Sequence, residues 1–209
     1  MDIKHRIHEI LAAEATAIAA VAVDDSFERA ITALETCSGK TVTTGMGKAG
    51  HVGRKFAALL SSTGTPAVFL HPGDAAHGDL GIIEQNDCIV AFSTSGKTIE
   101  VLEMIRHSRK LGSGMVIAIT SHLDSELRQM SDVVLNMGVV EEPCPLKLTP
   151  TASIAVMSAI SDALALVLME RKGFTRRDFS LRHHGGYLGS TARLEHSHDP
   201  HNAKVNADS

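Results

Sequence analysis

Five short, almost continuously apolar runs divide the middle of the chain, and segments with helical periodicity lie between them. Runs of this kind are typical of strands buried on both faces of a parallel sheet. Strands that alternate with helices indicate repeated βαβ units. The sequence therefore predicts an α/β protein with a five-stranded parallel sheet. The predicted strands are 41–45, 66–70, 87–92, 114–120 and 132–137.

Helical periodicity fills the segments around these strands. Pro150 and Thr151 suit the first turn of the longest helix, and Gly173 suits its end. That helix is strongly apolar but contains Asp162, so we expect a buried helix rather than a membrane span. The predicted helices are 3–36, 51–63, 98–112, 125–130 and 151–172.

The length of 209 residues favours a single domain, which we place at residues 1–193. Residues 194–209 are polar and without pattern, and we expect them to form a loose tail. His196, His198 and His201 have metal-like spacing, but such a cluster on a loose tail is a weak indication of a metal site.

Composition and charge exclude several classes of protein. The net charge of −4, without a basic cluster, argues against a nucleic-acid surface. The first twenty residues carry acids and histidines but no continuous apolar run, so we expect no signal peptide. The spacing of Cys37, Cys88 and Cys144 fits neither a disulfide framework nor a zinc knuckle. We therefore expect a cytoplasmic protein that binds neither nucleic acid nor membrane.

Candidate chemistry gathers at one edge of the predicted sheet. In an open parallel sheet, ligands bind beyond the carboxyl ends of the strands. Four segments rich in Gly, Ser, Thr and His leave the predicted strands at that edge: "TTGMGKAG", "LHPGDAAHGDLG", "STSGKT" and "ITSHLDS".

The "STSGKT" segment contains a GKT triplet but does not match a nucleotide-binding P-loop. The first glycine of that motif would fall on Ala91, inside the apolar run. Hydroxyl groups and free backbone N–H groups before a helix instead favour a cradle for one phosphate, and the alternative is a simple helix cap. The cradle residues are Ser93, Ser95, Gly96 and Thr98.

The "GMGKAG" segment is a second glycine-rich turn from a strand to a helix. Gly47 and Lys48 lie in it, and the lysine would supply a cation at the ligand edge. The dinucleotide-binding alternative is weak, because no acidic residue ends the next strand.

Four blocks in this order resemble the sugar isomerase (SIS) domain of D-arabinose 5-phosphate isomerases over about residues 5–190. The resemblance implies a flavodoxin-like αβα sandwich and the isomerisation of ribulose 5-phosphate and arabinose 5-phosphate through an enediol. It implies no required cofactor, a homotetramer, and a supply of arabinose 5-phosphate for the 3-deoxy-D-manno-octulosonate of lipopolysaccharide or capsule. The blocks are "GMGKAGHVGRKFAALLSSTGTPAVFLHPGDAAHGDLG", "STSGKTIE", "EEPCPLKLTPT" and "GFTRRDFSLRHHGG".

The same resemblance assigns roles to residues. Glu142 is expected to be the base, with its pKa raised by a semi-enclosed loop. His77 or His183 would open the sugar ring and relay protons, and Lys48 would offset negative charge. Catalytic positions are Lys48, Glu100, Glu142, His183 and His77. The resemblance also implies substrate contacts at Gly64, Thr65 and His77, and it would make His71 a contact for an inhibitory zinc ion.

Alternatives remain for individual residues and for the whole chain. Glu100 also suits the first turn of a helix as a simple N-terminal acid, and Glu141 could exchange roles with Glu142. The family's CBS pair is not in this sequence, and "HHGG" with His184 replaces the family's "HPGG". Lys97 stands where an acid is common in the "SGE" loops of the family. The rival functions are a non-catalytic phosphosugar sensor, an isomerase for a six- or seven-carbon phosphosugar, and an NTPase.

Overall fold

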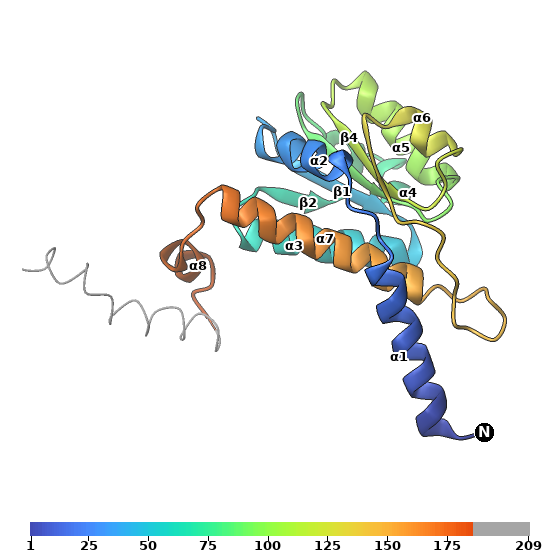
Figure 1. Cartoon of the computed structure of the whole chain (residues 1–209). Coiled ribbons are helices and arrows are strands. Elements are labelled where there is room, and N and C mark those ends of the chain that lie inside the picture. Colours follow the sequence, from blue (N-terminus) through green and yellow to red (C-terminus); the bar gives the residue numbers. More distant parts are fainter. Residues whose placement is uncertain (186–209) are drawn as a thin grey trace, which may run out of the picture.

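A computed structural model describes residues 1–185, in which five parallel strands form one sheet with helices on both faces (Figure 1). The strand order is β2-β1-β3-β4-β5, the order of flavodoxin-like folds. The predicted fold class is confirmed, and all five predicted strands are present. They are β1 (Thr41–Gly45), β2 (Ala67–Phe69), β3 (Cys88–Phe92), β4 (Val116–Thr120) and β5 (Val133–Asn136). The predicted end of the domain at 193 and the tail 194–209, with its histidines, lie outside the described residues.

Helices enclose the sheet in two layers. On one face, α2 (Asp25–Glu35), α3 (Gly47–Ser62) and α7 (Ala152–Arg171) pack against a core that includes Val90 and Phe92 of β3. On the other face, α5 (Ile99–Lys110) and α6 (Glu126–Met130) cover Ile89 and Ala91. Alternate residues of β3 therefore belong to different cores, which explains why the strand is apolar throughout.

The long predicted helix at the N-terminus is two helices. α1 (Ile3–Ala19) ends before residues 20–24, and α2 begins after Asp24, whose side chain accepts a hydrogen bond from Ser26 N at 2.9 Å. This capping starts α2 afresh, because the carboxylate satisfies an N–H group without an intrahelical partner. α1 buries none of its residues and extends away from the body beside α7 (Figure 1).

Short helices appear where the sequence analysis placed none. The loop after β2 contains α4 (Pro72–Ala75) and a 3-10 helix, η1 (Asp79–Ile82). After α7, Thr175 and Asp178 form a reciprocal capping box at the start of α8 (Arg176–Arg182). α7 is long and apolar enough to cross a membrane by composition, but half of that stretch is buried inside the fold. It is therefore a core helix here, as predicted.

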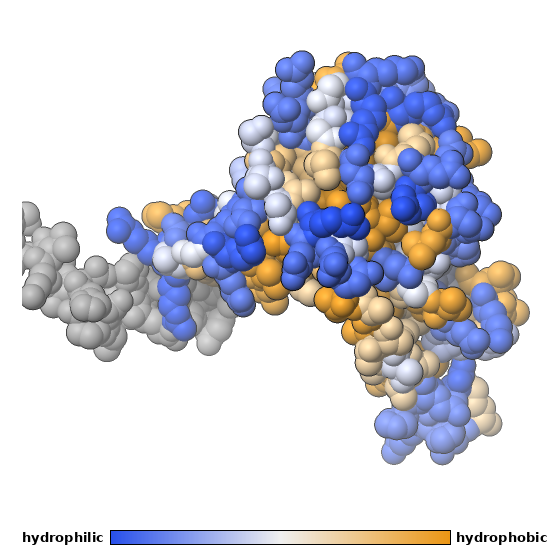
Figure 2. Space-filling model, turned by 45° about the horizontal axis from the view of Figure 1, so that its top comes forward, coloured by the Kyte–Doolittle hydropathy of each residue, from blue (hydrophilic) through white to orange (hydrophobic). Residues whose placement is uncertain are grey.

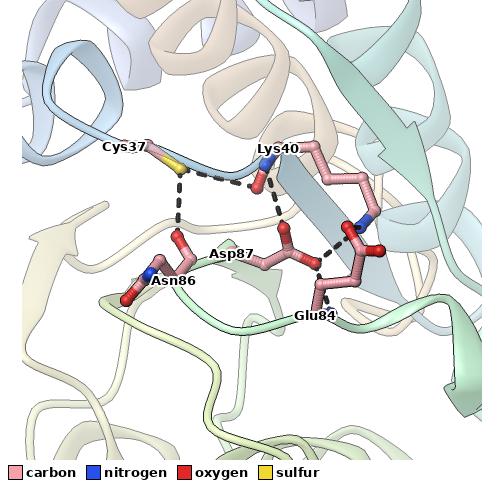
Figure 3. A network of polar contacts seen from close by, with 5 residues as sticks. All are labelled: Cys37, Lys40, Glu84, Asn86 and Asp87. Carbon is pink, nitrogen blue, oxygen red and sulfur yellow. Dashed lines mark hydrogen bonds and ion pairs between the residues drawn. The ribbon is translucent and has the colours of Figure 1, made fainter.

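A buried carboxylate joins the amino ends of β1 and β3 (Figure 3). Asp87 is fully buried and accepts hydrogen bonds from Lys40 N at 2.9 Å, Glu84 N at 2.8 Å and Lys40 Nζ at 2.8 Å. Burial alone would lower the pKa of Lys40, but hydrogen bonds to Asp87 and Glu84 outweigh it and raise that pKa. The Cys37 thiol donates to the Asn86 carbonyl beside this group. The network anchors the edge of the sheet opposite to the predicted ligand edge.

Candidate functional site

The loop between β3 and α5 forms a compact turn of hydroxyl groups. Ser93 Oγ accepts a hydrogen bond from Gly96 N at 3.1 Å and lies 2.9 Å from Thr98 Oγ1. Thr98 precedes α5 but makes no side-chain cap. The backbone N–H groups of the first turn of α5 therefore stay available to an anion, which favours the cradle over a simple helix cap.

Gly96 is required at the centre of this turn. Its φ of 62° lies in the left-handed region, and a Cβ there would lie 2.1 Å from Ser125 Oγ. No larger side chain fits without moving the loop between β4 and α6.

The loop after β4 supports the cradle from one side. The Thr94 carbonyl accepts hydrogen bonds from Ser121 N at 3.1 Å and Thr120 Oγ1 at 3.1 Å, and it lies 2.9 Å from His122 Nδ1. Three donors from one loop thus converge on a single carbonyl of the other. These contacts tie the two loops together.

A hollow of about 320 Å³ opens beside the cradle. This size falls in the range of small-molecule pockets. The structure therefore brings together the predicted Lys48, Ser93, Ser95 and Thr98, and places Gly47 and Gly96 next to them in the chain. The lining residues are Met46, Lys48, Ala49, Phe92, Ser93, Thr94, Ser95, Thr98, His122, Pro150 and Ile154.

His122 was missed as a site residue. The signal was available, because it follows a predicted strand at the carboxyl edge by two positions. Sequence alone did not separate it from the neighbouring polar residues of "ITSHLDS".

The side chain of Glu142, from the loop between β5 and α7, reaches the start of α7 and is held there by several hydrogen bonds. Glu142 Oε2 accepts from Thr151 N at 2.7 Å and Ala152 N at 2.8 Å, while Oε1 accepts from Ser153 N at 3.2 Å and from the Ser153 hydroxyl. Burial opposes ionisation of Glu142, but the donors of Ser153, Thr151 and Ala152 outweigh it and lower its pKa. The expected raised pKa is wrong, since the loop supplies donors to the carboxylate rather than an apolar wall.

Glu100 and the loop after β2 border a second hollow of about 420 Å³ between α4 and α5. Glu100 is exposed in the first turn of α5, and His77 is exposed in the turn after α4. His71 lies at the start of α4, with its Nδ1 3.7 Å from Asp74 Oδ2. Within residues 1–185 no group of three metal-ligating side chains surrounds it or any other point. Zinc binding by His71 stays a prediction.

Three predicted site residues lie at the other ends of the long helices. Gly64 follows α3, and a Cβ on it would lie 2.7 Å from the Phe174 ring. Thr65 Oγ1 accepts a hydrogen bond from Lys172 Nζ at 2.8 Å, and the His183 ring stacks on Phe179 at 3.8 Å. Because α7 with its 20 residues is about 30 Å long, these residues do not join the hollow within one chain.

Comparison with known proteins identifies the family. A sequence model of the SIS domain matches residues 36–167. This chain belongs to the SIS domain family. The match runs from the end of α2 to the last part of α7, and so includes every strand and the cradle.

Individual relatives of this SIS chain have more specific descriptions. It is 43% identical over 173 residues to arabinose 5-phosphate isomerase KdsD of Pseudomonas aeruginosa, covering 83% of this chain and 53% of that protein. KdsD of Escherichia coli K12 is 42% identical over 190 residues, covering 90% of this chain and 58% of that protein. The chain thus spans about half the length of these curated relatives.

Two solved structures match the SIS fold over nearly their whole length. One is a candidate phosphosugar isomerase involved in capsule formation from Bacteroides fragilis, with a TM-score of 0.85 and 43% identity, covering 88% of this chain and 99% of that one. The other is c3406 of Escherichia coli CFT073 in complex with arabinose 5-phosphate, with a TM-score of 0.84 and 38% identity, covering 87% and 97%.

Proposed function

We propose that this SIS protein is an aldose–ketose isomerase that interconverts D-arabinose 5-phosphate and D-ribulose 5-phosphate. The observation that carries the proposal is the hollow in which Lys48 and the hydroxyl groups of the cradle meet at the start of α5. The similarity to KdsD proteins and to a structure in complex with arabinose 5-phosphate supports the choice of sugar.

In this proposal the phosphate sits in the cradle. The hydroxyl groups of Ser95 and Thr98 and the first N–H groups of α5 donate hydrogen bonds to its oxygens, and the helix dipole adds to the attraction. Lys48 supplies a positive charge from α3, which also lines the hollow. The phosphate then fixes one end of the sugar, which orients C1 and C2 for the reaction.

The reaction moves a proton between two neighbouring carbons. A base takes the C2 proton of the open-chain aldose, an enediolate forms, and a proton returns to C1 to give the ketose. We propose Glu100 or Glu142 as the base, and His77 or His183 for ring opening and proton relay. The chemistry uses no redox cofactor and no required metal, and zinc at His71 would inhibit.

We further propose a homotetramer in which His183 of one subunit reaches the hollow of another. Exposed apolar side chains on α1 and α7 support such an assembly, and Figure 2 shows hydrophobic surface where α1 meets the body. Ile7, Leu11, Leu166 and Val167 are among them. The enzyme would act in the cytoplasm and supply arabinose 5-phosphate for 3-deoxy-D-manno-octulosonate.

The test mixes the purified chain with arabinose 5-phosphate, without nucleotide or metal, and measures ribulose 5-phosphate. Turnover supports the proposal, and a metal chelator should leave it unchanged. Binding of arabinose 5-phosphate without turnover would contradict it in favour of a sensor. Turnover of a six-carbon phosphosugar alone would contradict the choice of substrate.

A further inference from the structure

His122 brings the β4 loop to the lining of the hollow. Its position is fixed on both sides: its backbone N–H donates to Thr120 Oγ1 at 3.2 Å, and its Nδ1 lies 2.9 Å from the Thr94 carbonyl. The imidazole therefore has a defined orientation beside the cradle, although the residue is exposed.

The contact with Thr94 determines which ring nitrogen is free. A carbonyl oxygen only accepts hydrogen bonds, so Nδ1 must carry a proton in order to bond with it. Nε2 is then the nitrogen left for a ligand in the hollow. A phosphate dianion close to Nε2 would favour a proton there too, because an opposite charge stabilises the charged ring.

We propose that His122 is a phosphate-binding residue of this site and donates a hydrogen bond from Nε2 to the phosphate held by the Ser93–Thr98 loop. The inference rests on the proposed function for the identity of the sugar, but it concerns the phosphate alone. The cradle then has donors on two walls, with Lys48 on the α3 side and His122 on the β4 side.

Two substitutions separate this role from loop support. His122→Asn keeps an amide near the position of Nδ1, and so keeps a donor for the Thr94 carbonyl while it removes Nε2. His122→Gln places its amide near the position of Nε2 and gives up the Thr94 contact. The matched control is His107→Asn, an exposed histidine in the last turn of α5.

The probe is inorganic phosphate, measured by isothermal titration calorimetry on folded protein. We expect His122→Asn to weaken phosphate binding about tenfold or more, because a hydrogen bond to a charged group is lost. His122→Gln should bind more tightly than His122→Asn, and the control should bind like the parent. In parent protein labelled with ¹⁵N-histidine, the ¹⁵N NMR chemical shift of one imidazole Nε2 should change when phosphate is added.

Unchanged phosphate binding by His122→Asn would overturn the proposal. A His122→Gln variant as weak as or weaker than His122→Asn would also overturn it and assign His122 to loop support. An absence of isomerase activity in the parent, with the expected phosphate data, would reject only the proposed reaction.

Discussion

Glu142 and Ser153 are joined twice, because one carboxylate oxygen accepts hydrogen bonds from both the backbone N–H and the hydroxyl group of Ser153. The other oxygen takes the N–H groups of Thr151 and Ala152. The loop before α7 is thus tied to the first turn of that helix by one side chain, which serves as its cap from nine residues away.

Replacing this cap has a structural cost that depends on pH. In Glu142→Gln, an NH2 group replaces one carboxylate oxygen and faces N–H donors from which it cannot accept a hydrogen bond. We therefore expect a loss of about 1–2 kcal/mol in the free energy of unfolding at pH 7. The pKa of Glu142 is lowered in the folded state. Its contribution is therefore present above the pKa of the unfolded chain and is lost as the pH falls through the folded value.

Thermal unfolding of the parent and of Glu142→Gln, at pH 7 and in acid, measures how much the Glu142 cap contributes to stability at each pH. The difference in Tm between the two proteins should shrink in acid. A constant difference would contradict the capping role. If Glu142 is also the base, isomerase activity at pH 7 should fall by about a hundredfold or more, and Ser153→Ala should lower stability with a much smaller loss of activity.

Cys144 should be the reactive cysteine of this protein. The Thr149 hydroxyl and the backbone N–H groups of Thr149, Leu146 and Leu148 lower the pKa of its thiol to about 6. Burial raises the pKa of Cys88 to about 12. Because the thiolate is the nucleophile, iodoacetamide at pH 7 should label Cys144 and leave Cys88 unmodified, as read by peptide mass spectrometry.

Thr149→Val provides the control for this prediction. It removes the first of the donors to the Cys144 sulfur, so labelling of Cys144 at pH 6.5 should slow while the fold is retained. Labelling at an unchanged rate would show that the hydroxyl does not stabilise the thiolate.

Gly96→Ala should disrupt the cradle without a general loss of structure. The new Cβ meets Ser125 Oγ, and φ is unfavourable for alanine. We expect destabilisation of about 1–3 kcal/mol and a clear loss of phosphate binding. Adding Ser125→Gly removes the contact with Ser125 but not the strain, and it also removes the side-chain cap of α6, so stability should recover only in part. Full phosphate affinity in Gly96→Ala would place the ligand elsewhere.

Asp87→Asn should destabilise the fold and spare the site. The amide would face the Glu84 N–H and the Lys40 ammonium group, which are both donors. Breaking such a buried pair costs about 3 kcal/mol or more, measured by urea unfolding. Glu84→Gln is the control, because its side chain is 78% exposed and a surface pair contributes about 0–1 kcal/mol. Phosphate affinity of the folded Asp87→Asn protein should match that of the parent.

Subunit complementation tests the shared site. Lys48 lies at the start of α3 and His183 after α8, at opposite ends of the long helices. Lys48→Ala and His183→Ala proteins should each be inactive alone, and co-expression should restore part of the activity, because mixed assemblies contain one intact site. Co-expression without any recovery would indicate that both residues act in one subunit, and activity of the His183→Ala protein alone would show that His183 has no role.

Much of the fold could be predicted because its signals are local. Each strand is buried on both faces, so an apolar run identifies it without knowledge of its partners. The break between α1 and α2 was missed because apolar residues continue through residues 20–23. The Asp24 cap was the signal for the start of α2. The capping box of Thr175 and Asp178 was the signal for α8, which was also missed.

The site was predictable to the extent that it follows strand ends. Lys48 and the hydroxyl groups of the cradle meet because parallel strands bring their carboxyl ends to one edge. The ionisation of Glu142 was not predictable in this way, since its donors come from the far end of a loop. Gly64, Thr65 and His183 follow helix ends, and their positions depend on helix length and packing rather than on sequence pattern.

β3 carries the Asp87 network immediately before its first residue and the cradle immediately after its last. Side chains that hold the strands in register are therefore remote from those that meet the ligand. A directed-evolution library restricted to the four loops of the carboxyl edge would leave this anchor intact. With Gly96 kept unchanged, such a library would alter the ligand edge while the buried carboxylate of Asp87 continues to stabilise the opposite edge of the sheet.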